Sequence, residues 1–181
     1  MKYDKTIHHR RSIRLKGYDY SQAGAYFVTI CTWQREHLFG EVINGEISLS
    51  HYGEIVQLKW HNLLKHHHYL QLDELIIMPN HLHGIIVFTD DFCSQKGHGL
   101  PEIIRGFKTF SARQINKLRH LKGVSVWQRG YYEHIIRNEE SLIAIRKYII
   151  NNPLAWEKDE LHPHNPCKWD GKINLQMNYK I

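Results

Sequence analysis

Cysteine is scarce in this chain of 181 residues, and its three copies stand far apart, at Cys31, Cys93 and Cys167. Because no two form a CxxC pair, we expect neither a disulfide framework nor a cysteine zinc site. Isolated thiols are typical of a reducing compartment, which favours a cytoplasmic protein. The sequence also lacks a glycine-rich loop of the kind that cradles nucleotide phosphates. Nothing in it therefore indicates chemistry driven by ATP.

Long apolar runs, internal repeats, linkers and low-complexity segments are missing as well. No run approaches the length that spans a membrane, and the first residues lack the apolar core of a signal peptide. We therefore expect one domain over residues 1–181, with a basic arm at about 1–20, an extended tail at about 157–181 and no membrane partner.

Acidic side chains are outnumbered, since 18 Asp and Glu face 24 Lys and Arg, for a net charge of +6 with neutral histidines. This surplus favours a polyanionic partner, although many soluble proteins are mildly basic. Hydrophobic residues make up 42% of the chain and aromatic residues 12%, which excludes wholesale disorder.

The hydrophobic pattern predicts an α+β fold in which strands and helices alternate. β-Branched and aromatic runs predict strands over 25–33, 47–49, two within 73–88, and 124–137 with a break near Gly130. Apolar residues at helical spacing predict helices over 51–66, 101–121 and 139–152, whereas 34–45 reads as irregular. The main order is strand–helix–strand–strand–helix–strand. It predicts a ferredoxin-like antiparallel sheet with helices on one face plus one further helix that carries a tyrosine.

Two histidines at the start of the second strand within 73–88 are the first candidate for a functional site. His81 and His83 lie two apart, so they point to one face of a strand while Leu82 points into a core. Imidazole is a common ligand of catalytic metals, and this pair could form half of a metal site. The chain has 15 histidines, however, so a polar pair at a strand end is equally compatible with the pattern.

A tyrosine and an asparagine near the end of the last predicted helix form the second candidate. Tyr148 and Asn152 lie four apart and therefore share one helix face. A phenolate attacks phosphorus well, and Mg²⁺ or Mn²⁺ bound by two imidazoles and an amide oxygen would neutralise the charge that builds up. Spacing alone nevertheless favours the alternative in which Tyr148 only packs in the core and Asn152 caps the helix before Pro153.

Basic and aromatic side chains suggest a surface for single-stranded nucleic acid. Arg105, Lys108 and Arg113 lie on the polar face of the helix over 101–121, and Arg10, Arg11 and Arg14 lie in the N-terminal arm. Ordinary solvation of charged residues is an alternative for both groups, and for the arm it is the favoured one. Four aromatic residues could stack on bases, although core packing is an alternative for each and the favoured one for Trp127: Trp33, Trp127, Tyr131 and Tyr132.

Four motifs give the chain a resemblance to a known family: PNHLHGII, GFK, VWQRGYYEHIIRNEE and KYIINNPLAW, in this order between about residues 26 and 156. The chain resembles the single-tyrosine HUH transposases, and most closely their REP-associated tyrosine transposase branch. The basic segment HHRRSIRLKGYDY is longer than in the shortest relatives, so that its contact with DNA stays an open question.

The resemblance implies a role for several residues. His81, His83 and Asn152 match the metal ligands, and Tyr148 matches the nucleophile that forms a 5′-phosphotyrosine link. His134 and Arg137 match polar positions near the active site, and Lys108 matches a basic residue for the DNA backbone. Tyr131 and Tyr132 lie outside the motif of a tyrosine before NP, so they rank below Tyr148 as nucleophiles.

The implied activity is that of an Mg²⁺- or Mn²⁺-dependent endonuclease and strand transferase that cleaves single-stranded DNA near palindromic hairpins. Relatives include monomers and homodimers, and both states stay open for this chain. Two other functions also stay open: a DNA-binding module without catalysis, and a metal-dependent hydrolase in which water is the nucleophile.

Overall fold

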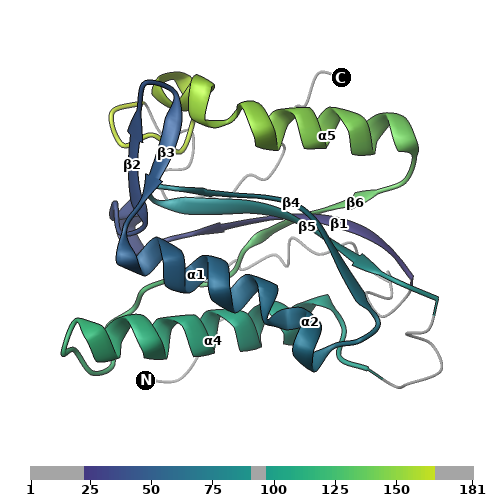
Figure 1. Ribbon diagram of the computed structural model, residues 1–181, viewed down its shortest axis with the longest axis horizontal. Helices are drawn as coiled ribbons and strands as arrows, with labels where there is room; N and C mark the ends of the chain where they lie inside the picture. The colour runs from purple at the N-terminus through teal and green to yellow at the C-terminus, as the bar shows by residue number, and fades with distance from the viewer. Residues whose placement is uncertain (1–22, 91–96, 166–181) are drawn as a thin grey trace, which may run out of the picture.

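A four-stranded antiparallel sheet with the order β4-β5-β1-β6 forms the centre of the fold (Figure 1). Its strands are β1 (Gly24–Cys31), β4 (Leu70–Met78), β5 (His81–Phe88) and β6 (Tyr132–Ile136). The structure is a computed structural model, and it describes residues 23–90 and 97–165. A tight turn joins β4 to β5, whereas the other connections pass through helices. This is the strand order of the ferredoxin-like fold, which confirms the prediction from the sequence.

Helices cover the two faces of the sheet unequally (Figure 1). One face carries α1 (His51–His61) and α4 (Leu100–Leu118), with the short α2 (Leu63–His66) beyond α1. The other face carries α5 (Glu139–Asn151), the helix that bears the tyrosine. The predicted placement of helices on one face, with the tyrosine helix apart from them, is therefore confirmed.

Alternation along β5 supplies a separate core to each face, because neighbouring strand residues point to opposite sides. Leu82 and Ile86 belong to the larger core, between the sheet and the α1–α4 pair. Ile85 belongs to the smaller core, where it meets Ile145 and Ile149 of α5. The odd-numbered residues of β5, the two histidines included, therefore face α5.

A close approach of two elements explains one glycine in the larger core. A Cβ at Gly84 of β5 would lie 2.5 Å from the Cζ2 atom of Trp60 in α1. Trp60 is fully buried and meets Phe107 of α4 in an edge-to-face contact with ring centroids 5.3 Å apart. The missing side chain at Gly84 thus lets the indole lie directly on the sheet.

Three local predictions need correction. The predicted helix over 51–66 is interrupted at Asn62, where α1 ends. The segment 34–45 is not irregular throughout, because β2 (Gly40–Ile43) pairs with β3 (Glu46–Leu49) around Asn44 and Gly45, whose φ angles of 53° and 79° suit a tight hairpin turn. The predicted strand over 124–137 is regular only in β6, since Gly130 takes a φ of 100° and breaks the run.

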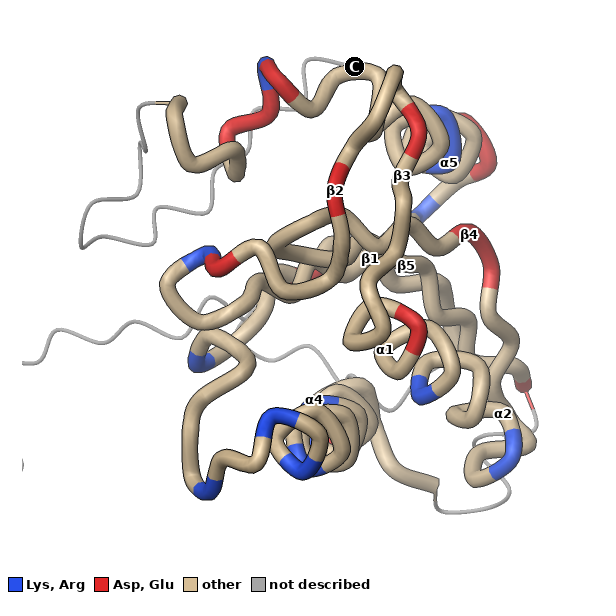
Figure 2. Tube along the Cα trace, turned by 60° about the vertical axis from the view of Figure 1, so that its left-hand side comes forward, with Lys and Arg blue, Asp and Glu red and all other residues tan. Residues whose placement is uncertain are grey.

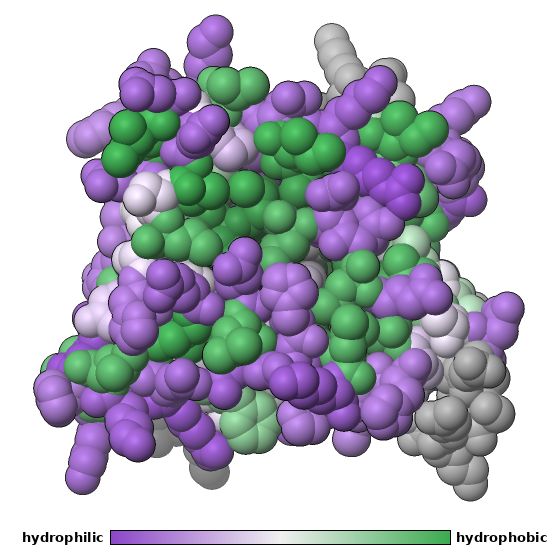
Figure 3. All heavy atoms as spheres, in the orientation of Figure 1, coloured by the Kyte–Doolittle hydropathy of each residue, from purple (hydrophilic) through white to green (hydrophobic). Residues whose placement is uncertain are grey.

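The face seen in Figure 3 carries both polar and apolar residues. Polar residues predominate along its margins, and apolar residues gather at the level of the sheet. Lys and Arg positions follow α4 in Figure 2. His66, at the end of α2, and His68, just after it, are exposed. Among residues 23–90 and 97–165, no helix has the length and apolar character needed to cross a membrane.

Candidate metal and tyrosine site

His81 and His83 lie side by side on the face of β5 that α5 covers. Both side chains are fully buried, and their ring centroids are 4.6 Å apart. In the neighbouring strand, Cys31 lies opposite His81 and Thr29 opposite His83. The prediction that the two imidazoles project to one face is therefore confirmed, and burial sets them apart from a solvated pair at a strand end.

Asn80 fixes the proton position on His81. The Nδ1 atom of His81 lies 2.7 Å from Oδ1 of Asn80, while Nδ2 of Asn80 donates to the carbonyl of Leu161 at 2.8 Å. Because an amide oxygen can only accept, Nδ1 of His81 must carry the proton in this arrangement. Its Nε2 atom is then a lone-pair donor, as metal coordination requires.

Asn152 presents a second lone-pair atom beside this imidazole. Its Nδ2 atom donates to Oδ2 of Asp159 at 3.2 Å, which turns the amide oxygen away from Asp159. Oδ1 of Asn152 and Nε2 of His81 are both buried without a hydrogen-bond partner. Two buried lone pairs cannot satisfy each other, so a cation between them would remove an energetic penalty for both.

His83 joins the nucleophile candidate to the pair. Its Nδ1 atom shares a hydrogen bond of 2.8 Å with Oγ1 of Thr29, and its Nε2 atom lies 3.3 Å from the hydroxyl of Tyr148. The rings of His83 and Tyr148 meet edge to face with centroids 5.1 Å apart. Tyr148 therefore reaches the histidine pair from α5, one helical turn before Asn152.

The chain after α5 folds back and closes the site. The 3-10 helix η2 (Pro153–Lys158) places the buried indole of Trp156 with its centroid 5.9 Å from that of His81. Asp159 follows, and its carboxylate and the ligand atoms of His81 and His83 all lie within 4.8 Å of one another. The site thus contains one anionic oxygen donor besides the neutral ones.

Three contributors to this site escaped the sequence analysis. Thr29 is a polar residue within an apolar strand, and Asn80 belongs to the turn just before the histidines. These local signals could have identified both residues. Asp159 carries no such signal, because only the reversal of the chain after Pro153 brings it back to α5.

The electrostatics of the site favour neutral side chains in the resting protein. Burial lowers the pKa of His81 to about 3. Burial and the neighbouring His81 also hold the pKa of His83 well below its usual range. Burial, with the negative charge of Asp159 as a smaller cause, raises the pKa of Tyr148 well above its usual range. Both imidazoles are therefore neutral, as metal coordination requires, and the phenol keeps its proton.

This donor set fits a divalent cation. It combines two neutral imidazoles and one amide oxygen, all buried, with one half-buried carboxylate: His81, His83, Asn152 and Asp159. Oxygen-rich sets suit Mg²⁺ and Mn²⁺, and imidazole adds affinity for Mn²⁺ over Mg²⁺.

The other predicted residues near the nucleophile lie on β6. His134 pairs with Phe27 and is half-buried on the α5 side of the sheet, and burial lowers its pKa, with a smaller effect of Arg137. Arg137 follows the strand and is exposed. Tyr132 pairs with Thr29, so it lies in the same row as His83 but two strand spacings away, roughly 10 Å.

The predicted DNA contacts lie farther from the site. The ammonium of Lys108 donates to the carbonyls of Gln128 and Gly130 at 2.6 and 2.7 Å, and burial lowers its pKa to about 8. Arg105 and Arg113 are exposed on α4, across the sheet from Tyr148. The arginines of the arm, Arg10, Arg11 and Arg14, lie outside the described residues.

The aromatic candidates for base stacking divide by burial. Trp127 is buried in the larger core, where its indole Nε1 donates to Oγ of Ser111 at 3.0 Å, as the packing alternative predicts. Trp33 is 41% exposed, and Tyr131 and Tyr132 are half-buried. Trp33 is therefore the most accessible of the four.

Known proteins resemble the chain along most of its length. A protein of Haemophilus influenzae without a described function is 42% identical over 177 residues, which cover 89% of this chain and 97% of the relative. A second protein of that organism, provisionally named a REP-associated tyrosine transposase, is 24% identical over 181 residues, or 90% and 97% of the two chains.

A solved structure shares the fold. It is described as a REP-associated tyrosine transposase bound to a REP hairpin, and it superposes with a TM-score of 0.57 over 90% of this chain and 93% of its own. Its sequence identity is 18%.

The segment from the first strand to the end of the tyrosine helix identifies the family of this chain. The model of the family described as "Transposase IS200 like" matches residues 22–152, which include β1, the histidine pair, Tyr148 and Asn152. This match and the relatives confirm the resemblance to REP-associated tyrosine transposases. The chain belongs to the family of IS200-like transposases.

Proposed function

We propose that this transposase is a metal-dependent endonuclease and strand transferase for single-stranded DNA, with Tyr148 as its nucleophile. One observation carries the proposal: the unpartnered Nε2 of His81 and Oδ1 of Asn152 meet in a buried site into which Tyr148 points. A tyrosine placed this close to a potential cation site suits attack on phosphorus better than a packing role does.

The residues would divide the work as follows. His81, His83 and Asn152 hold the cation, with Asp159 as a further oxygen donor, and the bound cation polarises the scissile phosphate. The Oη atom of Tyr148 loses its proton and bonds to phosphorus as the bond from phosphorus to the 3′ oxygen breaks. The leaving oxygen takes up a proton, which leaves a 5′-phosphotyrosine and a free 3′-OH. Attack by another 3′-OH reverses this step and rejoins the strands, so the energy of the phosphodiester bond is retained.

The substrate we propose is a hairpin formed by a palindromic repeat. The similar solved structure holds a REP hairpin, and the positive net charge of this chain suits a nucleic acid. Exposed Trp33 and the half-buried Tyr131 and Tyr132 offer rings for base stacking. The exposed Arg105 and Arg113 offer charges for phosphates.

A denaturing gel tests this proposal. Purified protein, labelled single-stranded hairpin DNA and Mn²⁺ should give a slow covalent band that is lost in Tyr148→Phe and His81→Ala. Tyr132→Phe is the matched control, because this second tyrosine faces the same side of the sheet, and it should keep the band.

Each contrary outcome would indicate a different function or a different nucleophile. Tight DNA binding without a band or cleavage in Mn²⁺ would indicate a non-catalytic module. Cleavage without a band would indicate that water is the nucleophile. A band that survives in Tyr148→Phe would mean that another tyrosine attacks.

A further inference from the structure

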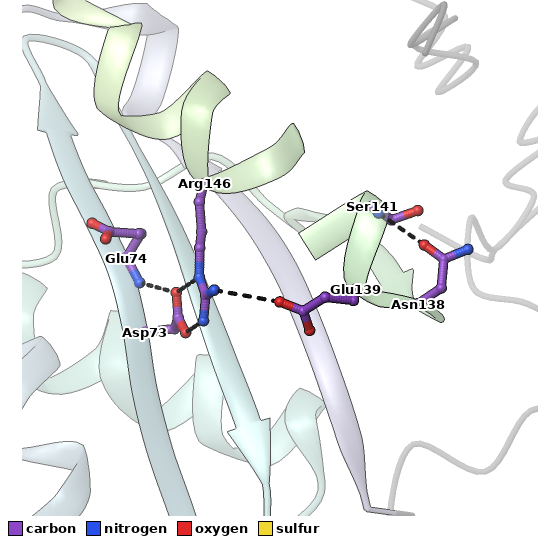
Figure 4. A network of polar contacts seen from close by, with 6 residues as sticks. All are labelled: Asp73, Glu74, Asn138, Glu139, Ser141 and Arg146. Carbon is purple, nitrogen blue, oxygen red and sulfur yellow. Dashed lines mark hydrogen bonds and ion pairs between the residues drawn. The ribbon is translucent and has the colours of Figure 1, made fainter. Parts of the chain in front are cut away.

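An ion pair ties the tyrosine helix to the edge of the sheet (Figure 4). Arg146 of α5 donates from Nε to Oδ1 of Asp73 at 2.8 Å and from Nη2 to Oδ2 at 2.6 Å. Two parallel bonds between a guanidinium and a carboxylate fix direction as well as distance. Glu139 lies 3.9 Å from the same guanidinium on its other side.

The acidic partner has a fixed orientation of its own. Asp73 lies where the register of β4 against β5 shifts, between Leu72 and Leu75. Its Oδ1 atom also accepts a hydrogen bond from the backbone amide of Glu74 at 2.8 Å (Figure 4). The carboxylate is thus also bonded to its own strand, and Arg146 links α5 to this point of β4.

Arg146 and Tyr148 lie on opposite flanks of the helix. Successive α-helical residues turn by about 100°, so Arg146 lies about 100° to one side of buried Ile145 and Tyr148 about 60° to the other. Asn152 falls between Tyr148 and the buried stripe. The apolar contacts of Ile145 and Ile149 hold α5 on the sheet through a non-directional force. The bidentate ion pair adds a directional contact on the flank opposite to Tyr148.

The radius of a helix determines how far its side chains move when it rotates about its axis. With side chains the radius is about 5–6 Å, so a rotation of ~20° moves a side-chain tip by roughly 2 Å. A displacement of about 1 Å can lower a catalysed rate ~100-fold. The same rotation would also shift Oδ1 of Asn152 relative to the histidine pair.

We propose that the pair Asp73–Arg146 is a positioning device, which sets the rotation of α5 and so holds Tyr148 and Asn152 against His81 and His83. The inference rests on the proposed function, but it also concerns metal affinity, which is measured without DNA. Neither residue touches the reacting atoms.

The test compares two ways of weakening α5. Arg146→Met removes the ion pair but keeps an apolar stem, and Arg146→Lys restores the charge with one bond instead of two. Asn138→Ala is the matched control, since it removes the helix cap in which Oδ1 of Asn138 accepts from the amide of Ser141 at 2.8 Å and leaves both hydrogen bonds between Arg146 and Asp73 in place. Thermal melting, the rate of adduct formation at saturating hairpin DNA, DNA affinity and Mn²⁺ affinity without DNA are measured for each.

Arg146→Met should slow adduct formation by about 10- to 100-fold and weaken Mn²⁺ binding by about 10-fold, with DNA affinity unchanged. The rate of adduct formation and the Mn²⁺ affinity of Arg146→Lys should lie between those of Arg146→Met and the wild type. Asn138→Ala should melt at a lower temperature than the wild type. Its rate of adduct formation and its Mn²⁺ affinity should stay within about twofold of the wild-type values. If Arg146→Met does not fold, Asp73→Asn is the second variant, because it keeps the shape of the partner.

Several outcomes would overturn the inference. Equal losses in Asn138→Ala and Arg146→Met at equal melting temperature would reduce the pair to a stabilising contact. A loss of DNA affinity alone would make Arg146 a DNA contact. Wild-type rates and Mn²⁺ affinity in Arg146→Met would remove the positioning role. If the wild type forms no adduct, the proposed function fails, and the Mn²⁺ affinities still decide this inference; a wild type that binds no Mn²⁺ overturns it.

Discussion

At the scale of the residue, Asp159 distinguishes this site from one made only of neutral donors. Its carboxylate lies within reach of both imidazoles and holds the amide of Asn152. Asp159→Asn removes this negative charge, and we expect Mn²⁺ affinity to fall by about 10- to 100-fold. Isothermal titration of metal-free protein measures it, with Glu157→Gln, an exposed acid nearby, as the control. Equal affinities in all three proteins would contradict a role for Asp159.

Gly84 allows a second prediction at this scale. Gly84→Ala places a methyl group 2.5 Å from Trp60, so overpacking should lower the free energy of unfolding by about 1–3 kcal/mol. Gly106→Ala is the control, since a Cβ there meets nothing within 4 Å on helix α4, and it should raise this free energy by about 0.5–1 kcal/mol. Urea unfolding measures the change in the free energy of unfolding for both variants. If both changes have the same sign, the close contact between Gly84 and Trp60 is contradicted.

At the scale of the element, the attachment of α5 to β4 should depend on pH. Hydrogen bonding from the guanidinium of Arg146 is the main cause that holds the pKa of Asp73 below its usual range. Glu74 and Glu139 are the other charged residues nearby. A carboxyl whose pKa is depressed by folding stabilises the protein above its unfolded pKa of about 3.9, and this contribution is lost as pH falls through the lower folded value.

The wild type should therefore melt higher than Asp73→Asn at pH 7, and the difference should shrink below about pH 4. Thermal melting of both proteins at several pH values between 7 and 2.5 measures this difference in melting temperature. Because the comparison is a difference, the titration of other groups cancels to first order. A difference that stays constant down to pH 2.5 would show that the carboxylate charge contributes nothing.

At the scale of the whole molecule, the sheet separates the basic helix α4 from Tyr148 and the histidine pair. Arg105 and Arg113 lie on α4, on the face opposite to Tyr148. If a hairpin wraps around the molecule to meet both faces, each arginine releases counterions from the DNA. The double variant Arg105→Gln/Arg113→Gln should then reduce the slope of log affinity against log salt by about 1.4, at ~0.7 for each phosphate of a single strand.

Titration of labelled hairpin DNA at several salt concentrations measures this slope. Adduct formation at saturating DNA should not change in the double variant, because the site itself is intact. Lys65→Gln, an exposed change on α2, serves as the control and should leave the slope close to that of the wild type. An unchanged slope in the double variant would place the DNA on one face only.

The sequence by itself determined the ferredoxin-like order, because apolar periodicity is a local property that each segment carries alone. It also determined that His81 and His83 share one face, since strand geometry fixes neighbours two residues apart. Helix geometry likewise made a spacing of four sufficient to place Tyr148 of α5 and Asn152, the residue that caps this helix, on one side. The hairpin around Asn44 and Gly45 had a local signal too, in its Asn-Gly turn.

Only the tertiary structure decided which faces meet. Asp159 joins the histidines because the chain reverses after Pro153, and Asp73 meets Arg146 because β4 shifts register beside α5. The burial that leaves Nε2 of His81 without a partner likewise depends on three separate elements: β5, α5 and η2. Contacts between residues distant in sequence depend on the packing of the whole chain, and no local pattern encodes them.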